Sequence, residues 1–123
     1  LLKPGAHIGH GAIIHGATIG KNCLVGMNAV IMDNVDVGDE CIIGALTFIK
    51  QDEKIPARSL VAGNPGKIIK QVNDEMLSWK TEGTKLYQSL PKEMFENWKE
   101  CEPLREIPGH LPLQAKDYKP FDK

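Results

Sequence analysis

The stretch from residue 19 to residue 49, IGKNCLVGMNAVIMDNVDVGDECIIGALTFI, carries a β-branched aliphatic residue at every sixth position. These positions are Ile19, Val25, Ile31, Val37, Ile43 and Ile49. A period of six fits neither an amphipathic helix nor a simple alternating strand. It is typical of a solenoid in which three six-residue repeats form one coil of a triangular prism and residues eighteen apart stack. The stretch therefore predicts a mainly β fold, a parallel β-helix.

Two further positions of the repeat are constrained. The second position is usually glycine, which we expect at a sharp corner or at a residue with positive φ. The fifth position is small and should point inward, as at Cys23 and Cys41. Because these cysteines are eighteen residues apart, we expect them to stack in the core and to stay reduced.

The repeat is broken once, because Ile14 and Ile19 are only five residues apart, and two histidines lie around this break. They are His10 and His15. Imidazole is a common ligand of Zn²⁺, and a catalytic zinc uses three protein ligands and a water. The pair predicts part of a metal site whose third ligand comes from elsewhere. Histidine ligands also accept Fe²⁺ or Co²⁺.

Four regions follow from the patterns along the chain. Residues 1–50 should form β-helix coils, with N-terminal coils apparently absent, and residues 51–72 an exit loop and extended segment with a Gly-Asn-Pro turn. Residues 73–102 should be helical: one helix capped by Asn73 and ending near Thr81, before Gly83, and a second over 84–101 that Pro91 should break or restart, with Ser89 as a candidate new cap. Residues 103–123, with four prolines, should form an irregular tail.

Composition narrows the function classes. The chain has 123 residues, 41% hydrophobic content and a net charge of −1, which predicts one soluble domain without a nucleic-acid or membrane partner. Three cysteines without metal-finger spacing favour a reducing, cytoplasmic location. An apolar helical stripe of Met94, Phe95, Trp98 and Cys101 should pack on the prism or on a neighbouring subunit.

Several segments resemble the γ-class carbonic anhydrase superfamily, and within it the hexapeptide proteins of phenylacetate-degradation and carnitine operons. They are residues 8–20 (IGHGAIIHGATIG), residues 24–30 (LVGMNAV), residues 56–61 (PARSLV), residues 79–81 (WKT) and residues 102–106 (EPLRE). The resemblance implies a homotrimer of left-handed β-helices, each followed by a C-terminal helix. It also implies zinc between subunits, held by three histidines from two chains. The family's five-residue step between two of these ligands maps onto His10 and His15.

The resemblance leaves three functions open. The leading one is a metal-dependent lyase or hydrolase that uses a zinc-bound hydroxide on CO₂, or on a related carbonyl such as a CoA thioester. The second is a hexapeptide CoA-dependent acyltransferase, which would need one histidine as a general base and no metal. The third is a non-catalytic trimeric scaffold. The first two act on a small-molecule substrate.

Overall fold

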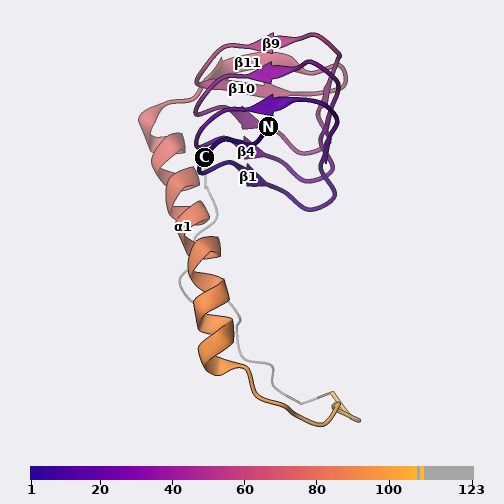
Figure 1. Cartoon of the computed structure of the whole chain (residues 1–123), viewed down its shortest axis with the longest axis vertical. Helices are drawn as coiled ribbons and strands as arrows, with labels where there is room; N and C mark the ends of the chain where they lie inside the picture. Colours follow the sequence, from indigo (N-terminus) through magenta and orange to yellow (C-terminus); the bar gives the residue numbers. More distant parts are fainter. Residues whose placement is uncertain (108, 110–123) are drawn as a thin grey trace.

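The computed structural model describes residues 1–107 and 109, and it shows a three-sided parallel β-helix followed by a long C-terminal helix (Figure 1). Each side of the prism is a sheet of short parallel strands, and the first sheet also has one antiparallel strand at its edge. The first sheet contains β1 (His7–Ile8), β4 (Leu24–Val25), β7 (Ile42–Ile43) and β10 (Ser59–Ala62). The second contains β2 (Ile13–Ile14), β5 (Val30–Ile31) and β8 (Phe48–Ile49), and the third β3 (Thr18–Ile19), β6 (Asp36–Val37) and β9 (Lys54–Ile55). The predicted left-handed β-helix class is confirmed.

The register follows the predicted stacking rule and also shows the break. Ile19 pairs with Val37 and Val25 with Ile43, each eighteen residues further along. In the first coil the step across the second sheet is seventeen, because Ile14 pairs with Ile31. The five-residue interval in the sequence is therefore a real shortening of one corner of the first coil.

The corners are built differently from the prediction. Positive φ occurs at the fourth position of the repeat, for example at Asn22, Asn28 and Asn34, rather than at the glycine in position two. That glycine is instead required by close approach, because a Cβ on Gly26 would lie 2.4 Å from the backbone nitrogen of Ala45. Asparagine tolerates the left-handed region better than most residues, which explains its recurrence at the fourth position.

The core is the predicted column of inward residues. Ile19, Val25, Ile31, Val37 and Ile43 are completely buried. Cys23 and Cys41 are also completely buried in this cluster and are free thiols. The Cys23 thiol donates a hydrogen bond to the Gly38 carbonyl oxygen at 3.1 Å. The hydrogen bond with the Cys41 sulfur, followed by burial, raises the pKa of Cys23, so this thiol stays protonated.

The stacked coils extend to Ala62 rather than ending at residue 50. Lys54 and Ile55 pair in parallel with the strand of Asp36 and Val37, and Val61 stacks on Ile43. The six-residue spacing in fact continues from Ile49 through Ile55 to Val61, across a charged segment that obscured it. The predicted extended segment forms a hairpin, because β10 pairs antiparallel with β11 (Lys67–Gln71) around the Gly-Asn-Pro turn.

Within the described residues the C-terminal region is one helix, α1 (Asp74–Asn97), where two were predicted. The Asn73 cap is confirmed, because its side chain accepts a hydrogen bond from the Met76 backbone N–H at 2.9 Å. The expected breaks at Gly83 and Pro91 are wrong. A glycine inside a helix costs only about 1 kcal/mol, which neighbouring contacts of the helix can offset. Ser89 does not cap a new helix, since its hydroxyl bonds to the Leu86 carbonyl and the Glu93 carboxylate.

α1 packs on the prism from its start as far as Tyr87. Met76 and Leu77 join Val72 against Leu24, Ile42 and Leu60 on the outer face of the first sheet. The second half projects past the first coil (Figure 1). The predicted stripe of Met94, Phe95 and Trp98 is exposed there, and Cys101 lies beyond the end of the helix. Of the predicted tail, residues 108 and 110–123 lie outside the described residues, and 103–107 have no helix or strand.

Candidate functional site

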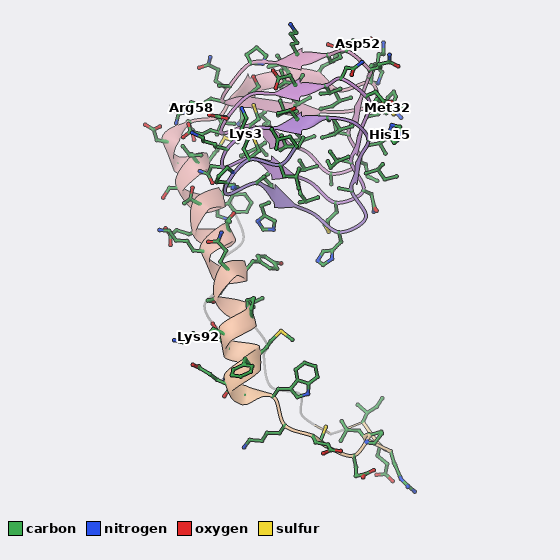
Figure 2. The ribbon with its side chains drawn as sticks, in the orientation of Figure 1. Lys3, His15, Met32, Asp52, Arg58 and Lys92 are labelled. Carbon is green, nitrogen blue, oxygen red and sulfur yellow. The ribbon has the colours of Figure 1, made fainter. Side chains whose placement is uncertain are left out.

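The two predicted metal ligands lie at opposite ends of one strand. His10 precedes β2 in the turn that contains Gly11, and His15 follows β2 immediately before the turn at Gly16. Both side chains are exposed. The two histidines therefore occupy two different corners of the prism and flank the second sheet. In Figure 2, His15 lies along the edge of the solenoid away from α1, below Met32 and Asp52.

The His15 ring is held from one side. Its Nδ1 atom lies 2.8 Å from Oδ2 of Asp33, which belongs to the next coil. A carboxylate can only accept, so Nδ1 carries the proton and donates it. In the neutral ring, Nε2 then has a free lone pair at the surface. A neutral imidazole binds a metal through such a lone pair. The residue type and tautomer of His15 therefore fit a metal ligand.

His10 lies on a groove between α1 and the first coils. The groove has a volume of about 390 Å³. Its walls are mainly apolar, and they include Ile8, Leu24, Met27, Trp79 and Tyr87. The His10 ring makes no hydrogen bond to any other described residue. Its nitrogens are therefore available to a ligand at the mouth of an apolar groove.

His7 lines the same groove but has a different environment. Its Nδ1 lies 3.2 Å from the Thr84 hydroxyl, and its ring meets Tyr87 edge to face with centroids 4.9 Å apart. Burial, and after it the positive charge of Lys80, lowers the pKa of His7. His7 is therefore a neutral residue that attaches α1 to the first coil.

Lys80 is a functional candidate that the sequence analysis did not identify. It is 2% exposed, and its ammonium donates to the Gly5 carbonyl at 2.8 Å and to Asn22 Oδ1 at 2.6 Å. Both acceptors are uncharged, and burial lowers the pKa of Lys80. The signal in the sequence is the i, i+4 series of Met76, Lys80 and Thr84, which is the buried face of α1.

The second sheet has an apolar outer face between the two histidines. Ile13 is 53% exposed, and Val30 and Phe48 are half-buried above it. At the His10 corner, Met27 and Leu46 are also exposed. The other two sheets differ. The helix and Val72 cover the first sheet, and the third presents the polar column of Thr18, Asp36 and Lys54.

The histidines do not complete a metal site by themselves. Nowhere in residues 1–107 or at 109 do three or more His, Cys, Asp or Glu side chains form a group that could hold a metal ion. The same residues include no helix long and apolar enough to span a bilayer. A metal ion at His10 or His15 would therefore need ligands from outside this set.

Comparison with known protein families shows which kind of repeat the chain contains. Residues 16–51 match the bacterial transferase hexapeptide model, which is described as six repeats. The match and the three parallel sheets show that the coils of this chain are built from hexapeptide repeats.

Among curated relatives, the carnitine operon protein CaiE of Salmonella agona is 40% identical over 112 residues, which is 91% of this chain and 57% of that protein. The chain thus spans a little over half the length of the relatives that it matches. The predicted relationship to the carnitine-operon proteins is confirmed.

Solved structures share the fold. A hexapeptide transferase family protein from Anaplasma phagocytophilum superposes with a TM-score of 0.69 at 25% identity, covering 72% of this chain and 54% of that one. A variant of perosamine N-acetyltransferase from Caulobacter crescentus, in complex with CoA and GDP-perosamine, gives a TM-score of 0.52 at 27% identity. It covers 57% of this chain and 33% of the enzyme.

Proposed function

We propose that the protein is a metal-dependent lyase or hydrolase of the γ-carbonic anhydrase type, acting on CO₂ or on a related carbonyl such as a CoA thioester. The observation that carries the proposal is the placement of His10 and His15 at the two corners that flank one apolar, uncovered face of the prism. The Nδ1 bond to Asp33, which leaves Nε2 of His15 free, supports the same conclusion.

The assembly follows from the three faces of the prism. One face is covered by α1, one is polar, and the face of Ile13, Val30 and Phe48 is apolar and open. A second copy of this chain is the occupant we propose, because a closed three-fold ring places the His10 corner of one subunit near the His15 corner of the next. Each metal would then receive His10 from one subunit and His15 from another. The third ligand would come from outside the described residues.

The residues of this chain have separate roles in this mechanism. His10 and His15 would hold Zn²⁺, Fe²⁺ or Co²⁺, and the bound metal supplies an acidified water and a Lewis acid for the carbonyl oxygen. Asp33 keeps the His15 proton on Nδ1. The groove beside His10 excludes water from the carbon skeleton of a small-molecule substrate through Met27, Trp79 and Tyr87. The buried free thiols Cys23 and Cys41 suit a reducing cytoplasm.

A second candidate is a CoA-dependent acyltransferase. The hexapeptide transferase model that matches residues 16–51 and the fold shared with the CoA-bound acetyltransferase favour it. In that reaction His10, whose ring makes no hydrogen bond to other described residues, would be the general base, and no metal would be needed.

Metal analysis and an acyl-transfer assay on the full-length protein separate the two functions. If the protein is a metalloenzyme, we expect about one metal per chain after zinc reconstitution. We also expect CO₂ hydration or thioester hydrolysis that a chelator abolishes. If the protein is an acyltransferase, we expect CoA-dependent transfer of an acyl group to an amine or hydroxyl, at a rate that a chelator leaves unchanged. Transfer without bound metal would refute the first proposal.

A further inference from the structure

We propose that Asp33 is a positioning residue, whose carboxylate fixes the tautomer and the orientation of the His15 ring and so selects Nε2 as the metal ligand. This inference rests on the proposed metal site. It assigns a role to a residue that the sequence analysis did not single out. The spacing in the sequence did not single it out, because across the shortened corner the step is seventeen, so that His15 is equivalent to Met32 and Asp33 is the residue after it.

The first observation is the contact itself. His15 and Asp33 come from successive coils, and the Nδ1 to Oδ2 distance of 2.8 Å is that of a charge-assisted hydrogen bond. A metal-bound histidine almost always donates its second ring N–H to a carboxylate, a backbone carbonyl or water. Asp33 is placed to accept that proton.

The second observation is the shortened corner. The His15 N–H bonds to the Ile31 carbonyl at 2.8 Å, and the Met32 N–H bonds to the Ile49 carbonyl at 3.1 Å, so His15 and Met32 are equivalent in the ladder. After Met32 the chain has Asp33 before the turn residue Asn34, whereas His15 leads directly into Gly16. Gly16 alone therefore takes the place of both Asp33 and Asn34: it has the positive φ of Asn34, and its carbonyl accepts from the Asn34 N–H as the Asp33 carbonyl accepts from the Asp52 N–H. The missing residue leaves the space through which the Asp33 carboxylate reaches His15.

The third observation is the glycine in the same corner. An ideal Cβ on Gly16 would lie 2.4 Å from Oδ1 and 3.3 Å from Cγ of Asp33. Any side chain at this position would displace the carboxylate. The same turn position in the next two coils is occupied by Asn34 and Asp52, so the fold itself does not demand glycine there. Gly16 and the one-residue shortening together make room for this contact.

The experiment measures zinc affinity of the full-length protein by competition with a chromophoric chelator. Losing a hydrogen-bond partner of a metal-bound histidine typically costs 10–100-fold in metal affinity. We therefore expect Asp33→Ala to weaken zinc binding by about 10–100-fold. Asp33→Asn, whose oxygen can still accept the proton, should give a smaller loss. The matched control is Asp36→Asn, an exposed carboxylate on β6, and it should leave the affinity unchanged.

A second measurement is the tautomer of His15, read from the ¹⁵N shifts of the zinc-free protein. Wild type should be the Nδ1–H form, and Asp33→Ala should lose this preference while keeping its unfolding midpoint. An Nε2–H tautomer in wild type, or wild-type zinc affinity in Asp33→Ala, would overturn the inference while leaving the metal site intact. A wild-type protein that binds no zinc would overturn the proposed function and this role with it.

Discussion

Gly16→Ala tests the corner that holds the candidate site. Gly16 has a φ of +70°, and alanine in the left-handed region costs about 1–2 kcal/mol. The new Cβ would also lie 2.4 Å from Oδ1 of Asp33, so that side chain must leave its position, at a further cost of about 0.5–1.5 kcal/mol for an off-rotamer carboxylate. We expect a loss of about 1.5–3.5 kcal/mol in the free energy of unfolding, measured by urea denaturation. Zinc affinity should fall as well, because Asp33 no longer reaches His15.

Gly5→Ala is the matched control for this prediction. Gly5 also has a positive φ, +75°, but its added Cβ would lie 3.4 Å from the nearest atoms of Asn22, which is an ordinary contact. Gly5→Ala should lower the free energy of unfolding only by the conformational cost of alanine in the left-handed region, about 1–2 kcal/mol. Equal losses for the two variants would refute the reasoning. So would a Gly16→Ala loss that is unchanged in an Asp33→Ala background, where the clash is absent.

Three further predictions concern the scaffold. Gly83→Ala should stabilise the protein by up to about 1 kcal/mol, because Gly83 is inside α1 and an added Cβ meets nothing within 4 Å; a lower urea midpoint would contradict this. Ile31→Ala should cost about 2–5 kcal/mol, since the side chain is completely buried between Ile14 and Ile49, and a loss below about 1 kcal/mol would refute the packed core. The lowered pKa of His7 means that the unfolded chain binds more protons between that pKa and the ordinary value of about 6.5. Stability should therefore rise with pH through this window and level off above it, and His7→Phe should flatten the rise in urea midpoints between pH 5 and pH 8.

The solenoid was predictable because its signal is periodic. One aliphatic residue per side of each coil fixes both the fold and the register, and a five-residue interval marked the shortened corner. The end of the coils was missed because Lys50, Asp52 and Glu53 are polar residues at outward positions, where charge costs little. They hid the continuing spacing of Ile49 and Ile55.

The helix and the details of the site were less predictable. Gly83 and Pro91 are poor helix residues, yet contacts such as those of Met76 and Lys80 with the coils hold the first half of α1 in place. Local propensity cannot report such contacts between distant segments. His10 and His15 were identified from type and spacing alone. The role of Asp33 depends on the register between successive coils, which only the structure shows.

The most direct test of the central claim is the metal content of the full-length protein and of three variants, by elemental analysis after reconstitution with zinc. Wild type should hold about one zinc per chain, and His10→Ala and His15→Ala should each lose it, because each removes one of three ligands. His7→Ala should retain the wild-type content, since His7 is bonded to Thr84 and packs on Tyr87. Wild-type protein with less than about 0.2 zinc per chain, or His10→Ala with the wild-type content, would contradict the account.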